Sequence, residues 1–295
     1  MTQTVRVRVP ASTANIGPGY DCLGMALTLY ADFRFTLSDE LIVTGCPEAY
    51  RNADNLVLQA FRRVYEKAGQ PAPTVKLEIE SEVPVSRGLG SSSTCIVAGL
   101  AAANAFLGNP YTKDDLFQFC TEIEGHPDNA APAVFGGLTA SFMTGETAKT
   151  VAFNPHEDWR FVAVIPDYEV RTAEARKIVK KDIHLSTAVH SVSHALAMVR
   201  GLELGDESLV GAACDDLLHE PYRRTLIKEY TSLREKALKE GAATFFISGS
   251  GSTLIAATMK EEVAENFVKS VNVMYPTFGA KILRVCRKGL VVEAQ

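Results

Sequence analysis

The sequence lacks the features that mark membrane-spanning, secreted and zinc-ribbon proteins. Its longest apolar stretch, residues 95–103, falls well short of the ~20 residues that span a bilayer. The amino terminus leads directly into a strand pattern, without the apolar segment of a secretory signal. The six cysteines lie far apart and form no C-x-x-C pair, so we expect reduced thiols rather than a disulfide framework or a zinc ribbon. We therefore expect a cytoplasmic protein without a membrane partner.

Basic residues are fewer than acidic residues in this sequence. Lysine and arginine number 30 against 35 aspartates and glutamates, which gives a net charge of −5. A general nucleic-acid surface needs the opposite sign, so we expect no nucleic-acid partner. An anionic ligand must then be held locally, by a few positioned side chains and backbone amides. Apolar residues at 46% and charged residues at 22% are typical of globular proteins and exclude disordered, collagenous and coiled-coil chains.

The length of 295 residues and the order of the predicted elements favour two lobes. Residues 5–9 alternate between valine and arginine as in a half-buried strand, which Pro10 is expected to end. Amphipathic helices are predicted over residues 55–68 and 207–218, and an apolar helix over residues 92–107. Strands and helices are mixed without the regular alternation of a doubly wound sheet, so the pattern favours an α+β fold.

The most informative segment is the glycine- and serine-rich stretch over residues 84–94. It lies between a predicted strand and the apolar helix, and its small residues allow a ligand to approach the backbone closely. Successive amides at a helix start form an anion site, and the serine hydroxyls can donate to phosphate oxygens. The segment has no lysine at its end and is therefore not a Walker loop. An ordinary serine-capped turn between strand and helix stays open as an alternative.

Three ordered segments carry a resemblance to a known family. Residues 84–93 read P-x-x-x-G-L-G-S-S-S, residues 10–24 form a turn-rich segment with N-x-G-x-G-Y-D, and residues 247–252 read I-S-G-S-G-S. In this order they resemble the phosphate loop, the substrate loop and the carboxy-terminal glycine loop of the GHMP small-molecule kinases. Residues 124–132, E-G-H-P-D-N-A-A-P, are similar to the middle segment of the branch that acts on L-homoserine.

The resemblance implies a two-lobed α+β GHMP-kinase fold. The amino-terminal lobe, residues 1–155, would resemble a ribosomal-protein domain and bind ATP, and the carboxy-terminal lobe, residues 156–295, would be ferredoxin-like and complete the substrate site. The implied activity is ATP- and Mg²⁺-dependent phosphorylation of the L-homoserine hydroxyl, for threonine synthesis. A kinase for another small alcohol and an inactive nucleotide-binding relative remain alternatives. The sequence leaves open a homodimer.

The family pattern also implies a substrate site. A zwitterionic amino acid needs a carboxylate for its ammonium group and arginines for its carboxylate. Asp21 and Asn15 would meet the ammonium group, and Arg176 and Arg223 would hold the carboxylate. The same residues could instead be turn residues and solvated arginines. The remaining predicted substrate contacts are His126, Thr172, Gly249 and Gly251.

The nucleotide and metal residues follow from the same resemblance. Ser92 and Glu124 are the predicted Mg²⁺ ligands, because a hard cation prefers oxygen donors, and Glu122 stays an alternative to Glu124. Asp128 and Asn129 would position the hydroxyl, and no residue is assigned as the general base. With Ser92 and Glu124 they form the predicted catalytic set. The predicted nucleotide contacts are Asn55 and the loop residues Pro84, Val85, Ser86, Arg87, Gly88, Leu89, Gly90, Ser91, Ser92, Ser93 and Thr94.

One further pair stands outside these motifs. His190 and His194 lie one helical turn apart, a spacing that can ligate zinc. Residue 191 is serine, where a zinc protease has the catalytic glutamate of H-E-x-x-H. The sequence alone therefore favours an ordinary structural role for the two histidines.

Overall fold

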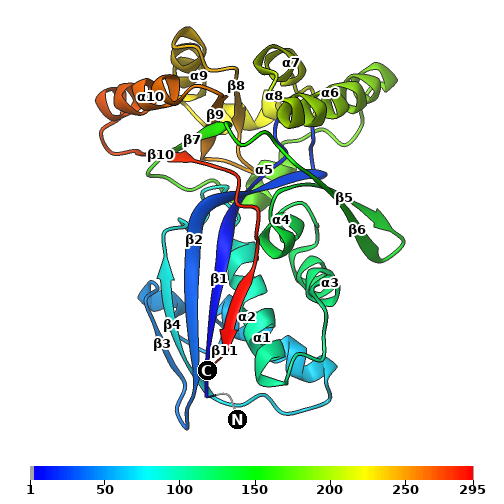
Figure 1. The fold of residues 1–295 in the computed structure, drawn as a ribbon, viewed down its shortest axis with the longest axis vertical. Helices are drawn as coiled ribbons and strands as arrows, with labels where there is room; N and C mark the ends of the chain where they lie inside the picture. Colours follow the sequence, from blue (N-terminus) through cyan, green and yellow to red (C-terminus); the bar gives the residue numbers. More distant parts are fainter. Residues whose placement is uncertain (1–2, 295) are drawn as a thin grey trace.

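The computed structural model describes residues 3–294, and in these residues two β-sheets pack with helices, which leave one face of the first sheet uncovered (Figure 1). This confirms the two-lobed α+β fold. The first sheet consists of β1 (Thr4–Ala14), β2 (Leu23–Leu37), β3 (Ile42–Thr44), β4 (Val75–Ser81), β5 (Leu138–Thr144), β6 (Thr147–Phe153) and β11 (Val291–Ala294). The second consists of β7 (Arg160–Ile165), β8 (Thr244–Ile247), β9 (Leu254–Thr258) and β10 (Gly279–Leu283).

The helices divide between the two sheets. Those packed with the first sheet are α1 (Leu56–Lys67), α2 (Ser91–Phe106), α3 (Lys113–Glu124) and α4 (Ala130–Phe135), with the short 3-10 helix η1 (Glu48–Tyr50). The second sheet is accompanied by α5 (Thr172–Lys177), α6 (Leu185–Leu204), α7 (Glu207–Ala213), α8 (Glu220–Arg223), η2 (Arg224–Leu226), α9 (Tyr230–Lys239) and α10 (Glu261–Met274). Among the described residues, no helix combines the length and the apolar character needed to cross a membrane.

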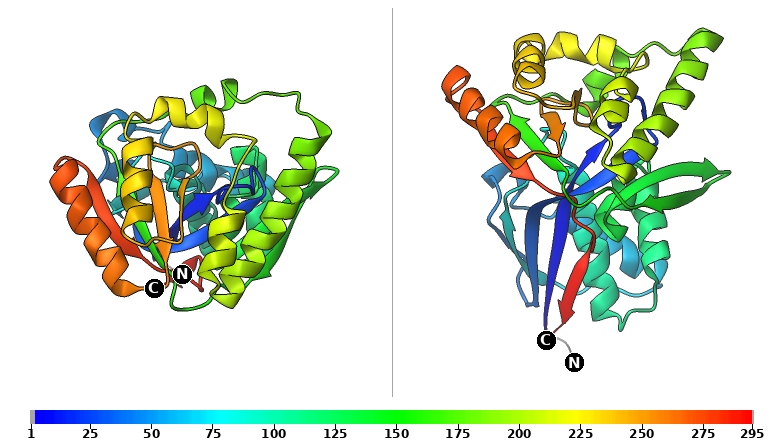
Figure 2. Two further views of the ribbon diagram at one scale, coloured as in Figure 1. Left: turned by 90° about the horizontal axis from the view of Figure 1, so that it is seen from above. Right: turned by 45° about the horizontal axis from the view of Figure 1, so that its top comes forward.

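The last strand returns to the first lobe. The first sheet has the order β11-β1-β2-β4-β3, with β5 and β6 attached through β2, and the second has the order β10-β7-β9-β8. Strand β11 pairs antiparallel with β1, so the ends of the described chain lie side by side (Figures 1 and 2). The sheets change between β6 and β7, near the predicted division at residue 155, but β11 lies across that division. The division of the chain into residues 1–155 and 156–295 stays a prediction.

Two predicted element boundaries are wrong. Strand β1 does not end at Pro10 but continues to Ala14, with a β-bulge between Pro10 and Ala11. A bulge tolerates proline because a residue there need not donate to the ladder. The helix predicted over residues 207–218 stops at Ala213, since the next residues turn to let the Asp216 carboxylate accept the amides of His219 and Glu220 at the start of α8.

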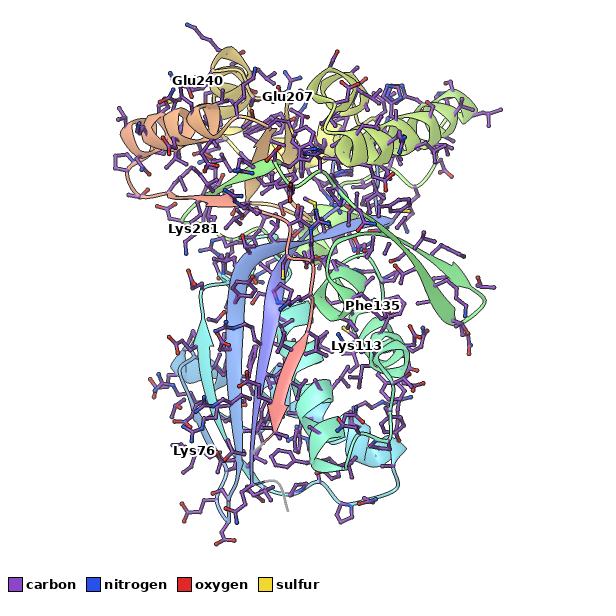
Figure 3. The ribbon with its side chains drawn as sticks, viewed as in Figure 1. Lys76, Lys113, Phe135, Glu207, Glu240 and Lys281 are labelled. Atoms are coloured by element: carbon purple, nitrogen blue, oxygen red, sulfur yellow. The ribbon has the colours of Figure 1, made fainter. Side chains whose placement is uncertain are left out.

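Helix α2 forms the centre of the first lobe and brings the phosphate-loop segment to the lobe junction. Almost every residue from Ser93 to Ala105 is buried, as expected for a helix that is apolar all round. Gly99 allows α1 to pack closely, because a Cβ there would lie 2.1 Å from the Val57 carbonyl oxygen. Lys281 on β10 lies at the edge of the junction (Figure 3). Its Nζ lies 2.5 Å from Oε2 of Glu82, which follows β4.

Candidate active site

A cavity of about 540 Å³ lies between the two lobes. One part of its wall comes from β2, β4, the segment between β3 and α1, and the segment before α2. The rest comes from the β1–β2 loop, the α3–α4 loop, α5, α8 and the β8–β9 turn. A concave site lined by converging polar groups from several elements is typical of ligand binding. The structure brings together most of the predicted substrate and catalytic residues in this cavity, namely Asn15, Asp21, Ser92, Glu124, His126, Asp128, Asn129, Thr172, Arg176, Arg223 and Gly249.

The backbone of the glycine–serine loop turns its carbonyl groups toward the protein. The Leu89 carbonyl accepts the Ser12 amide at 3.1 Å, and the Gly88 carbonyl accepts the Ser248 hydroxyl at 2.6 Å. Within residues 3–294, none of the five amides from Gly88 to Ser92 donates to a protein acceptor. These amides surround the start of α2, where the helix dipole also favours an anion.

The loop residues differ in what they reach. Pro84 to Gly88 and Gly90 to Ser92 line the cavity, whereas three predicted nucleotide contacts are buried beneath it and do not, namely Leu89, Ser93 and Thr94. The Arg87 guanidinium donates to the carbonyl oxygens of Pro166 at 3.1 Å and Asp167 at 3.0 Å. Arg87 therefore joins the two lobes beside the cavity, and its hydrogen bonds are made to the protein.

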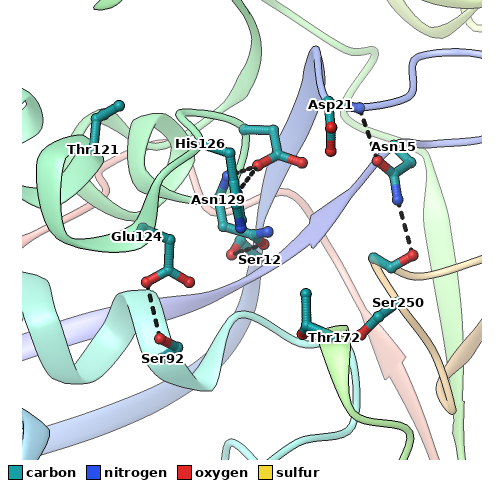
Figure 4. A network of polar contacts seen from close by, with 12 residues as sticks. Ser12, Asn15, Asp21, Ser92, Thr121, Glu124, His126, Asn129, Thr172 and Ser250 are labelled. Atoms are coloured by element: carbon teal, nitrogen blue, oxygen red, sulfur yellow. Dashed lines mark hydrogen bonds and ion pairs between the residues drawn. The ribbon is translucent and has the colours of Figure 1, made fainter. Parts of the chain in front are cut away.

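The two predicted metal ligands lie next to one another. The Ser92 hydroxyl donates to Glu124 Oε2 at 2.8 Å (Figure 4). Burial raises the pKa of Glu124, and the Ser92 hydrogen bond partly offsets this by stabilising the carboxylate. The alternative, Glu122, does not line the cavity and instead pairs with Lys67 at 3.0 Å. The geometry thus favours Glu124.

A short hydrogen-bonded chain crosses the floor of the cavity (Figure 4). His126 Nδ1 lies 2.5 Å from Asp128 Oδ1, which also accepts the Asn129 amide. Burial opposes the charged imidazole, but the hydrogen bond and the charge of Asp128 outweigh it and raise the pKa of His126. The buried Ser12 hydroxyl donates to Asn129 Oδ1 at 2.8 Å and so fixes the amide orientation.

Sequence reasoning missed Ser12, because only the structure shows that Ser12 packs closely against Gly90. A Cβ on Gly90 would lie 2.1 Å from Ser12 Oγ and 3.2 Å from Asn129 Oδ1. Gly90 also has a positive φ of 69°, which favours glycine at this position. The second glycine of the loop therefore lets the loop, β1 and the α3–α4 segment meet at one point.

Opposite charges face one another at the substrate end. Arg176 on α5 forms two parallel hydrogen bonds with Asp21, each of 2.8 Å. Arg223 on α8 is buried, donates to the Gly249 carbonyl at 2.7 Å and lies over the ring of Tyr20, a residue that sequence reasoning also missed. This end of the cavity thus holds two arginines and the Asp21 carboxylate, and the Asp128 carboxylate lies near enough to stabilise the charge of both arginines.

The β1–β2 loop that carries Asp21 is held by the other lobe. Asn15 donates from Nδ2 to the Gly249 carbonyl at 2.8 Å and accepts the Asp21 amide on Oδ1 at 3.0 Å. The buried His219 imidazole lies 3.0 Å through Nε2 from the Gly17 carbonyl, an acceptor, so Nε2 carries the proton. Both polar atoms of the Asn15 side chain therefore already have hydrogen-bond partners in the protein. Its role toward an ammonium group stays a prediction.

The remaining predicted residues are placed as follows. Thr172 lines the cavity with its hydroxyl 3.4 Å from that of Ser250, whereas Gly251 does not line it (Figure 4). Asn55 lines the far end, where its side chain caps α1 by accepting the Val57 amide and donates to the Tyr50 carbonyl. Its amide thus shapes the wall of the cavity.

Comparison with known proteins agrees with this geometry. The family models described as the GHMP kinases N terminal domain and the GHMP kinases C terminal match residues 55–137 and 198–277. A homoserine kinase of Synechococcus is 40% identical to the chain, over 99% of this chain and 98% of that protein. The chain belongs to the GHMP kinase family.

Other relatives extend this result. A homoserine kinase of Clostridium beijerinckii is 41% identical over 85% of each protein. The solved homoserine kinase of Cytophaga hutchinsonii has a TM-score of 0.88 at 30% identity and covers 99% of this chain and 98% of that chain. A mevalonate kinase structure, at 15% identity and a TM-score of 0.72, covers 95% of this chain and 98% of that chain and shows the shared fold alone. The resemblance of the motifs is thereby confirmed, and GHMP kinases use ATP.

Proposed function

We propose that this GHMP kinase transfers the γ-phosphoryl group of ATP to the side-chain hydroxyl of L-homoserine, yielding ADP and O-phospho-L-homoserine for threonine synthesis. The observation that carries the proposal is the row of amides from Gly88 to Ser92, which have no protein acceptor within the described chain. Such a row at a helix start holds phosphate oxygens. The homoserine kinases at 40% and 41% identity support the choice of acceptor.

The charges at the other end of the cavity support an amino acid as the acceptor. Asp21 and Arg176 neutralise one another, and a zwitterion inserted between them would exchange partners with both. The ammonium group would bind Asp21, and the carboxylate would bind Arg176 beside the buried Arg223. A sugar or a hydroxy acid lacks the ammonium group and would leave Asp21 without a new partner.

The donors near the loop fit Mg²⁺. The Ser92 hydroxyl and the Glu124 carboxylate are hard oxygen ligands 2.8 Å apart, beside the row of amides. When bound there with the nucleotide, Mg²⁺ supplies charge neutralisation at the phosphates.

Phosphoryl transfer depends mainly on alignment and charge stabilisation, and these tasks fall to residues of this chain. Asp128, held by His126, and Asn129, held by Ser12, line the cavity, and we expect them to orient the acceptor hydroxyl. No residue is assigned to remove the hydroxyl proton. A homodimer stays a prediction, which the native mass of the chain in solution will test.

A coupled assay for ADP release tests the proposal. The purified chain is supplied with ATP, Mg²⁺ and, in turn, L-homoserine, mevalonate, galactose and shikimate. We expect turnover with L-homoserine alone. Turnover with another alcohol and none with L-homoserine would refute the substrate, and ATP binding without transfer to any alcohol would indicate an inactive relative.

A further inference from the structure

Two histidines and an aspartate gather away from the kinase site, on the carboxy-terminal lobe. His190 and His194 lie one turn apart on α6, and Asp215 lies in the loop between α7 and α8. One potential ligand atom from each of the three side chains lies within 4.8 Å of the other two. None of the three lines the cavity that holds the predicted kinase residues.

The hydrogen bonds of His194 prepare its ring for a cation. His194 Nδ1 lies 2.9 Å from the His190 carbonyl oxygen, which can only accept, so Nδ1 carries the proton. The lone pair is then on Nε2. A metal-bound histidine almost always donates its other ring N–H to a carbonyl or carboxylate in this way.

His190 already faces two oxygen atoms of Asp215. Its Nε2 lies 3.0 Å from the Asp215 carbonyl oxygen and 3.4 Å from the carboxylate Oδ2. Both oxygens are acceptors, so the proton of His190 occupies the space between these groups. A cation in this space would meet the Nε2 nitrogen and the Asp215 oxygens on opposite sides, and the proton of the neutral His190 ring would move from Nε2 to Nδ1, so that the imidazole stays neutral.

One ring must turn before both imidazoles can bind the same ion. The rings stack with their centroids 3.6 Å and their planes 21° apart, so their nitrogen lone pairs lie in nearly parallel planes and converge only after one ring rotates about its Cβ–Cγ bond. Tetrahedral ligands at bonds of about 2.1 Å lie about 3.4 Å from one another. The Asp215 side chain is 63% exposed and can rotate to close the difference. A water molecule would complete the fourth position.

We propose that His190, His194 and Asp215 form a second metal site, specific for a borderline divalent transition metal such as Zn²⁺. Two imidazoles and one carboxylate suit Zn²⁺, whereas Mg²⁺ prefers all-oxygen ligands and would not compete. By binding His190 and His194 on α6 and Asp215 in the loop after α7, the ion would link α6 to the segment over residues 214–216. Cys214 in this segment packs on Gly17 of the β1–β2 loop, since a Cβ on Gly17 would lie 2.9 Å from Cys214 Sγ. The proposed site is therefore structural and lies outside the kinase cavity.

Titration of the untagged full-length chain with ZnCl₂, in excess Mg²⁺ and without nucleotide, tests the proposal. We expect one equivalent of Zn²⁺ to bind and to raise the melting temperature. His194→Gln and Asp215→Asn should each weaken binding by at least ~10-fold while ATP-dependent activity stays at the wild-type level. The matched control is His156→Gln, because His156 is another exposed histidine beside a carboxylate, 3.6 Å from Asp158, and should leave Zn²⁺ affinity unchanged.

Co²⁺ substitution distinguishes this site from binding by thiols. We expect a tetrahedral visible spectrum without a thiolate charge-transfer band, although Cys214 is the neighbour of Asp215. The proposal is overturned if the wild-type chain binds no Zn²⁺, if both variants retain wild-type affinity, or if the Co²⁺ spectrum contains a thiolate band. Circular dichroism of each variant confirms that a loss of binding does not reflect unfolding.

Discussion

Replacement of Asp21 by asparagine should weaken the binding of L-homoserine without affecting ATP. The Asp21 and Arg176 side chains are 36% and 35% exposed, so their ion pair adds no more than about 1 kcal/mol to stability in water. With an ammonium group enclosed against it, Asp21 would make a charge-assisted hydrogen bond that contributes about 2 kcal/mol. At 1.4 kcal/mol per factor of ten, Asp21→Asn should raise the KM for L-homoserine about 30-fold.

A substrate analogue separates this loss from a rearrangement of Arg176. The compound 4-hydroxybutyrate has the carboxylate and hydroxyl of homoserine but no ammonium group. The wild-type chain should prefer L-homoserine over this analogue in kcat/KM, and Asp21→Asn should reduce the preference by the same factor of about 30. Both ligands keep the carboxylate, so any change in how Arg176 binds it affects both alike and cancels in the ratio.

The matched control for Asp21→Asn is Asp32→Asn. Asp32 also forms two hydrogen bonds with an arginine, Arg8, at 2.8 and 3.1 Å; it lies on β2 and, unlike the next residue Phe33, does not line the cavity, because successive side chains of a strand point to opposite faces. This variant should keep wild-type kinetics for both alcohols. The reasoning is refuted if Asp21→Asn retains the preference for L-homoserine, or if its KM for ATP rises in parallel with that for the alcohol.

Three further predictions concern the loop, the metal ligands and a buried histidine. Gly90→Ala should abolish ATP binding in calorimetry, because its Cβ would meet Ser12 Oγ at 2.1 Å. The control Gly69→Ala has a similar φ but no atom within 4 Å of its Cβ and should bind ATP normally. An equal loss of ATP affinity in both variants would contradict this. Glu124→Gln should raise the Mg²⁺ concentration for half-maximal activity at least ~10-fold, whereas Glu122→Gln should leave that concentration unchanged. If only Glu122→Gln raised it, Glu122 would be the Mg²⁺ ligand. Burial lowers the pKa of His219 from 6.5 to about 4. Between these pH values the unfolded chain binds a proton that the folded chain excludes, so lowering the pH from 6.5 to 4 should reduce the free energy of unfolding by about 3 kcal/mol. His219→Gln should remove this part of the acid sensitivity in urea-unfolding curves, and an unchanged difference between pH 6.5 and 4 would show that other groups cause it.

The sequence predicted the location of the site because each motif is a contiguous segment with unusual composition. The glycines and serines of residues 84–94 identify a loop at a helix start whatever the rest of the chain does. The cap of α1 by Asn55 is equally local, because its side chain bonds to an amide only two residues away. By contrast, β6 was not predicted, since it is a mostly exposed hairpin strand with little apolar alternation.

The sequence could not show which polar side-chain atoms are already hydrogen-bonded within the protein. Arg87 reads as a charge available to phosphate, but its guanidinium binds carbonyl groups about 80 positions away in the chain. The Asn15 amide bonds to Gly249 across 234 positions. Pattern reasoning assigns a side chain to a segment, whereas its hydrogen bonds are decided by the packing of the two lobes.

This packing explains how the β1–β2 loop keeps an unfavourable backbone. Asn15, Ile16 and Asp21 all have positive φ, at 70°, 48° and 53°, and for the β-branched Ile16 this conformation is a true outlier. Each such residue costs about 1–2 kcal/mol, which local contacts of an exposed loop would not offset. The compensation comes from the carboxy-terminal lobe, where Gly249 accepts from Asn15 and the buried His219 donates to Gly17. The carboxylate of Asp21 therefore reaches its place only when both lobes are assembled, which couples the substrate site to the fold of the whole chain.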